Sequence, residues 1–70
     1  MIFELKCKFL AQEEKQTKKG NEYNVVSLMQ GVDTLKLMSD IDLDFEFGQD
    51  FIAIIDYNST YKSMRLIGVK

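Results

Sequence analysis

The 70-residue chain has no histidine, no proline and a single cysteine, Cys7. One thiol cannot close an internal disulfide, and without histidine a zinc site built from cysteine and histidine ligands is excluded. We therefore expect Cys7 to pack as a small apolar side chain, and we expect a reducing, cytoplasmic location. Because proline is absent, no strand is confined to a sheet edge on that ground.

Long apolar runs and catalytic motifs are also absent. No apolar run approaches the roughly 20 residues of a membrane span, and residues 1–6 lack the basic leader and cleavage site of a signal peptide. There is no glycine-rich phosphate loop and no nucleophile elbow. We therefore expect no enzyme activity, cofactor, metal, small-molecule substrate or membrane partner. The length and the 46% apolar fraction predict one globular domain over residues 1–70.

The net charge of −2 hides an uneven distribution of charge. Residues 39–50 hold five acidic residues and no basic one, whereas the rest of the chain has nine basic residues and six acidic ones. The overall charge argues against a nucleic-acid partner, and the local distribution permits one. The acidic stretch lacks the spacing of a calcium-binding EF-hand loop, so we expect a solvated edge that discourages strand pairing. Its carboxylates belong to Asp40, Asp42, Asp44, Glu46 and Asp50.

Apolar and polar residues alternate with period two along most of the chain, which predicts half-buried strands. The expected strands cover residues 2–12, 22–30, 34–38, 51–57 and 61–69. The polar residues 12–21 predict a loop, and 30–33 and 56–60 predict turns. Five short strands in 70 residues predict an all-β fold, a small five-stranded oligonucleotide-binding (OB) barrel. An SH3-like barrel is the alternative, because periodicity does not fix the strand order.

The linker before the fourth expected strand also alternates. Ile41, Leu43, Phe45 and Phe47 are interleaved with acidic residues. This period predicts an extended segment laid over the end of the barrel, with its acidic side chains outward. One short helical turn capped at Ser39 is the alternative.

A cationic corner precedes the second expected strand. Lys15, Lys18 and Lys19 lie in the first expected loop, and Tyr23 follows Gly20 at the start of an alternating run. Single-strand binders combine cations that contact phosphates with aromatic rings that stack on bases. We expect the lysines to contact phosphates and Tyr23 to stack, with Val25 extending the surface. A solvated loop and a tyrosine packed in the core are the alternative interpretations.

Further candidates lie elsewhere on the expected barrel. Lys36 is on the third strand, next to the strand of Tyr23 in an OB barrel. Tyr57 and Tyr61 bracket the expected loop between the last two strands, which OB barrels use for ligands. Lys62 and Arg65 follow, at positions of opposite parity on an ideal strand. Arg65 is either a phosphate contact or an edge residue whose stem covers the core.

Three short features lie within residues 17–70. They are the basic loop with Lys19, Gly20 and Tyr23, the entry to the fourth strand at Gly48 and Phe51, and the closing Arg65-Leu66-Ile67. In these features the chain resembles the single-stranded-DNA-binding, helix-destabilising proteins of filamentous phages. The resemblance implies a homodimeric OB barrel that binds single strands with little sequence preference and acts in DNA replication of a phage or plasmid. It implies that Lys18, Lys19 and Arg65 contact phosphates and that Tyr23 stacks. That family is richer in arginine and has a longer hairpin between its last strands.

The sequence thus predicts a non-enzymatic single-stranded-DNA-binding protein, with DNA and RNA not distinguished. A protein-interaction module whose acidic edge, residues 40–50, meets a basic partner is the alternative. Burial of Tyr23, Tyr57 and Tyr61 would remove the stacking surface and favour this alternative. A self-assembling structural protein is a third alternative.

Overall fold

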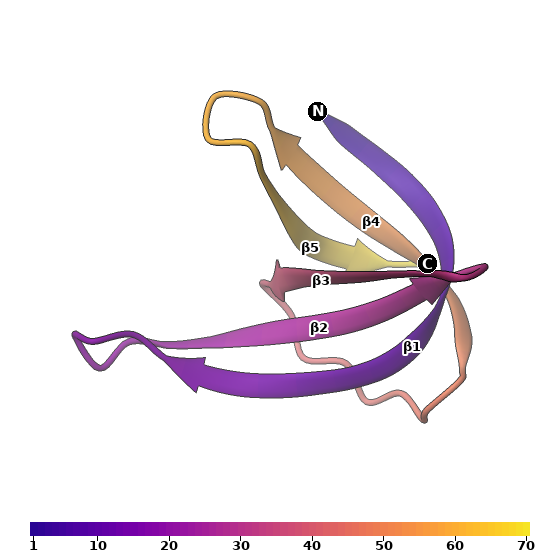
Figure 1. The fold of residues 1–70 in the computed structure, drawn as a ribbon, viewed down its shortest axis with the longest axis horizontal. Coiled ribbons are helices and arrows are strands. Elements are labelled where there is room, and N and C mark those ends of the chain that lie inside the picture. Colours follow the sequence, from indigo (N-terminus) through magenta and orange to yellow (C-terminus); the bar gives the residue numbers. More distant parts are fainter.

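The computed structural model describes all 70 residues and contains five strands and no helix (Figure 1). The strands close into a barrel in the order β1-β2-β3-β5-β4, with β1 paired to both β2 and β4. This exchanged order of the last two strands favours the OB-like barrel over the SH3-like alternative and confirms the predicted fold class. The elements are β1 (Ile2–Gln16), β2 (Glu22–Gln30), β3 (Asp33–Ser39), β4 (Asp50–Asn58) and β5 (Ser63–Val69).

β1 is the longest strand and serves two partners. Its first half, from Ile2 to Lys8, pairs antiparallel with β4, and its second half, from Lys8 to Gln16, pairs antiparallel with β2. The register shifts between Phe9 and Ala11, where a bulge lets the strand bend from one partner to the other. This bend is what curves the sheet into a barrel.

The interior is small and apolar. Alternate residues of each strand point inward, so the predicted strand pattern produces the core directly. Cys7 is one of them, with its thiol directed at the carbonyl oxygen of Phe51 at 3.8 Å, and burial raises its pKa. The expected packing of Cys7 as an apolar side chain is therefore confirmed. The nine buried apolar residues are Cys7, Phe9, Val26, Leu28, Leu37, Phe51, Ala53, Ile55 and Leu66.

Residues 40–49 run from the end of β3 to the start of β4 as an extended segment, and no helical turn forms. Side chains of other elements bind its backbone: the Leu43 amide donates to Gln12 Oε1 at 2.8 Å. The ring of Phe45 packs edge-on against Phe9 and Phe51, with centroid distances of 6.0 and 4.8 Å. The segment thus closes the barrel end where a helix was the alternative.

The structure corrects three expectations. β1 continues to Gln16 rather than ending near residue 12, so Lys15 lies on a strand and not in a loop. β5 begins at Ser63, so Tyr61 belongs to the preceding loop. Phe47 does not share the buried side of Ile41, Leu43 and Phe45, because its side chain is 80% exposed.

The seam between β3 and β5 is the weakest pairing in the barrel. These two strands run parallel and share only the pairs Met38–Arg65 and Ser39–Leu66. The amide of Asp40 adds one bond to the carbonyl oxygen of Leu66 at 2.9 Å. The barrel is therefore closed, but by few bonds at this seam. The structure contains no helix with the length and apolar character needed to cross a bilayer.

Candidate nucleic-acid interface

The outer face of β2 and β3 presents a row of apolar and cationic side chains. Residues directly opposite each other in an antiparallel pair point to the same side of a sheet. Val25 pairs with Met38, and Ser27 pairs with Lys36, at positions that alternate with the buried Val26 and Leu37. Met38 is 45% exposed, so this face offers an apolar surface to solvent.

Tyr23 stands at the end of this row. It pairs with Lys15 across the β1–β2 hairpin, so its ring and that ammonium group lie on the same face. Tyr23 is half-buried, whereas Lys15 is exposed and lies 3.9 Å from a carboxylate oxygen of Glu13. A ring held by the strand beside a cation is a geometry that can accept a base and its phosphate.

The hairpin tip carries two free cations. The amide and side-chain hydroxyl of Thr17 both bond to the backbone of Asn21, and the Gly20 amide donates to the Thr17 carbonyl oxygen at 3.0 Å. Gly20 has φ +86°, a left-handed conformation that closes this tight loop and that other residues rarely adopt. Lys18 and Lys19 are exposed there and make no ion pair. Figure 1 shows the tip extending away from the barrel.

Arg65 lies on the same outer face but is already paired. Its register partner on β3 is Met38, which extends the row formed by Val25 and Met38. The guanidinium donates to Asp40 Oδ2 at 2.9 Å, and both side chains are about half exposed. The expected phosphate contact therefore has a carboxylate as a competitor, one that the strand pattern did not reveal.

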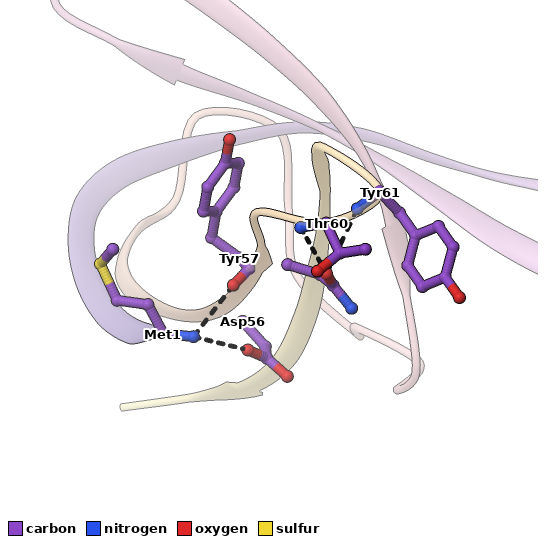
Figure 2. A network of polar contacts seen from close by, with 6 residues as sticks. Met1, Asp56, Tyr57, Thr60 and Tyr61 are labelled. Carbon is purple, nitrogen blue, oxygen red and sulfur yellow. Dashed lines mark hydrogen bonds and ion pairs between the residues drawn. The ribbon is translucent and has the colours of Figure 1, made fainter.

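The β4–β5 loop separates the remaining candidates. Figure 2 shows the rings of Tyr57 and Tyr61 pointing to opposite sides of the loop, so they do not form one stacking surface. Tyr57 pairs with Met64 at an interior position of the barrel end and is half-buried, whereas Tyr61 is 79% exposed. Asn58 Oδ1 accepts the amides of Thr60 and Tyr61 at 3.0 and 3.3 Å, which fixes the turn.

Lys62 and the Met1 amine complete this region. Lys62 has φ +50° and is exposed, without an ion pair. The Met1 amine donates to the Tyr57 carbonyl oxygen at 2.9 Å and lies 3.5 Å from Asp56 Oδ1, so β1 and the end of β4 are held together (Figure 2).

The inner face of the hairpin is acidic. Beyond the barrel, Glu14 and Glu22 occupy the inward positions of β1 and β2, and the segment after β3 brings Asp42 beneath them. These groups line a groove of about 630 Å³ that Tyr23 also borders. Asn24 Nδ2 donates to Asp42 Oδ1 at 2.6 Å, which offsets part of the negative charge. The carboxylates of this groove lie on the side of the hairpin opposite to Lys15, and Glu13, which pairs with Val25, is the acidic residue on the outer face beside Lys15.

Repulsion within this groove affects the pKa of Glu14. A hydrogen bond with Glu22, together with the negative charges of Glu22 and Asp42, raises the pKa of Glu14 above its ordinary value. Glu14 therefore holds its proton more tightly in the folded chain than a glutamate without acidic neighbours does. No three acidic or cysteine side chains are arranged to hold a metal ion.

The structure thus brings together part of the predicted set. Lys15, Tyr23, Lys36 and Arg65 share the outer face of the sheet, with Lys18 and Lys19 at its tip. Tyr57, Tyr61 and Lys62 belong to the β4–β5 loop. Sequence reasoning missed Met38, although its alternation with Leu37 on the third strand was a signal for it.

Comparisons with protein families, with curated proteins and with solved structures found no match for this chain. The resemblance to helix-destabilising proteins accordingly stays a prediction.

Proposed function

We propose that the chain is a non-enzymatic protein that binds single-stranded nucleic acid, with DNA as the first candidate. The single observation that carries the proposal is the outer face on which Tyr23 and Lys15 lie side by side, next to the Val25–Met38 pair. It is supported by the OB-like strand order, a fold in which strands β2 and β3 and the adjoining loops are common ligand surfaces.

The roles follow from the chemistry of each group. Stacking on Tyr23 is sequence-tolerant, because every base has an aromatic face. Val25 and Met38 offer apolar contact to a neighbouring base or sugar. Lys18, Lys19 and Lys36 are free to neutralise phosphates, so binding releases counterions and weakens as salt is added. Nothing in this set reads the edges of bases, so little sequence preference is expected.

Burial of all three tyrosines is the condition under which the interaction-module alternative would be favoured over stacking. Tyr61 is 79% exposed and Tyr23 is half-buried on the outer face, so that condition is not met. A replication role and a phage or plasmid origin remain part of the proposal as consequences of the resemblance, and a cytoplasmic location as a consequence of the single cysteine. None of them is needed for the binding test.

The test is a titration of a fluorescent oligonucleotide with the wild-type chain, Tyr23→Ala and Tyr23→Phe, followed by anisotropy at two salt concentrations. We expect Tyr23→Ala to lose about 1–3 kcal/mol of binding free energy, and Tyr23→Phe to retain most of it because the ring remains. Duplex DNA should compete poorly. Absence of wild-type binding even below about 50 mM salt would overturn the proposal.

A further inference from the structure

A second concave site lies away from the proposed nucleic-acid face. It is a pocket of about 450 Å³ where β1 passes from β4 to β2. Its apolar lining includes Met29, Phe51 and Ile52, and three lysines surround it: Lys6, Lys8 and Lys70. Met29 lies on the outer side of β2 but at the opposite end of that strand from Tyr23, and none of the other residues belongs to the Tyr23 and Lys15 site. The pocket therefore needs its own explanation.

The charges around this pocket favour an acidic occupant. Lys6 makes no ion pair. Lys8 is paired with Asp50 at 3.0 Å and Lys70 with Glu4 at 2.9 Å, and all four side chains are roughly half exposed or more. Exposed pairs of this kind are weak and exchange partners at little cost. An apolar group flanked by carboxylates would satisfy both the lining and the lysines.

The same chain presents such a group. The side chain of Phe47 is 80% exposed, and Asp44 and Glu46 beside it are exposed as well. The turn is held in place by the Gly48 amide, which donates to the Phe9 carbonyl oxygen at 2.7 Å. Phe47 does not line the lysine pocket of its own chain. An exposed phenyl ring on a fixed turn has no internal partner.

We propose that this pocket receives residues 44–47 of a second copy of the chain. The ring of Phe47 enters between Met29 and Ile52, and the carboxylates of that segment pair with the surrounding lysines. Charge complementarity between the two features selects this occupant, since Lys6 in the pocket and the ring of Phe47 are each left without a partner within one chain. The proposal concerns self-association and stands independently of nucleic-acid binding.

The first experiment measures the apparent mass of the nucleic-acid-free protein by sedimentation equilibrium. A small, charged interface predicts a dissociation constant between about 1 μM and about 1 mM that weakens as salt is added. We expect Phe47→Ala and Lys6→Glu each to weaken association about tenfold or more. Tyr61→Ala, which removes a comparably exposed ring on the β4–β5 loop, should leave association unchanged. Circular dichroism and thermal melting confirm that each variant is folded.

The second experiment mixes complementary variants. Lys6→Glu alone replaces the unpaired cation of the pocket with an anion, and Asp44→Lys/Glu46→Lys alone carries a basic segment, so in each variant the pocket and the segment no longer match in charge. Mixed in equal amounts, they should associate, because each wild-type feature then meets a complementary partner. A wild-type chain that stays monomeric at low salt, a Phe47→Ala variant that associates like wild type, or a mixture that stays monomeric would each overturn the proposal.

Discussion

The two faces of the β1–β2 hairpin differ in charge although they are built from the same two strands. On the outer face Lys15 pairs with Tyr23, whereas one residue along each strand Glu14 and Asn24 pair on the inner face. A strand alternates its side chains, so a single-residue step moves from a surface suited to phosphates to one that repels them. The overall charge of −2 therefore says little about what either face binds. The strand register decides which charged groups each face presents to a ligand.

The largest expected effect is at Phe45, whose ring anchors the segment that brings Asp42 to the inner face. Without this anchor the acidic inner face would lose one of its carboxylates. Phe45→Ala should lose about 3 kcal/mol of unfolding free energy, the low end for a buried phenylalanine because this ring is partly exposed. For a domain of this size that lowers the melting temperature by roughly 12–24 °C. Phe47→Ala, two residues on and 80% exposed, should change stability by less than about 0.5 kcal/mol. Equal losses in thermal unfolding would contradict the packing described here.

The cationic tip of the outer face is tested by Lys18→Ala/Lys19→Ala. If each lysine neutralises one phosphate, the log–log slope of affinity against salt should become shallower by about 0.7 per lysine, or about 1.4 for the pair. Lys6→Ala is the matched control, because Lys6 is also unpaired but lines the pocket between β4 and β2. Oligonucleotide titrations over a salt series provide the slopes. Identical slopes for all three proteins would remove the tip from the interface.

A smaller effect on oligonucleotide affinity is expected from Arg65 on the outer face. Asp40→Asn releases Arg65 from its 2.9 Å ion pair and leaves the guanidinium free for a phosphate. Because exposed pairs of this kind are weak, affinity for an oligonucleotide should rise only about 2- to 5-fold. Asp50→Asn, which releases Lys8 at the opposite end of β2 from Tyr23, should have no such effect. A fall in affinity for Asp40→Asn would mean that the pair positions Arg65 rather than competing for it.

The inner face is tested by the pH dependence of stability. The pKa of Glu14 is raised above 4.5 in the folded chain, so folding favours its protonated form. Its contribution to stability is therefore present below the unfolded-state value and is lost as the pH rises through the folded-state value. Glu14→Gln should melt higher than wild type at pH 7, and the difference should vanish in acid. Glu4→Gln, which removes a partner of Lys70, is the control and should not melt higher at pH 7. A lower melting temperature for Glu14→Gln at pH 7 would contradict repulsion in the groove.

Alternation along the chain was sufficient to predict the five strands and most of the core. β2 matched its predicted bounds because Gly20 and Gly31, both with positive φ, mark its flanks. The end of β1 was missed because residues 13–16 are all polar and bury nothing. They are held by pairing with β2, a contact that depends on partners six to twelve residues away.

The site was less predictable than the fold. Alternation placed Tyr23 and Val25 on one face, but it did not reveal that Asp40 would reach Arg65 or that Asp42 would lie beneath Glu14. Those contacts depend on the path of residues 40–49 across the barrel end. The exposure of Phe47 was not predicted for the same reason. Gly48 turns the chain at the point where continued alternation would have buried this ring.

The two-pair seam between β3 and β5 has a consequence for how the barrel responds to a ligand. With so few bonds across it, transient opening should begin there, and amide hydrogens beside it should exchange with solvent sooner than those of the β1–β2 ladder. A strand of nucleic acid that touched Lys36 and Arg65 together would span this gap. Bound nucleic acid would then hold β3 and β5 together, and slower amide hydrogen exchange at Ser39 and Leu66 would show this.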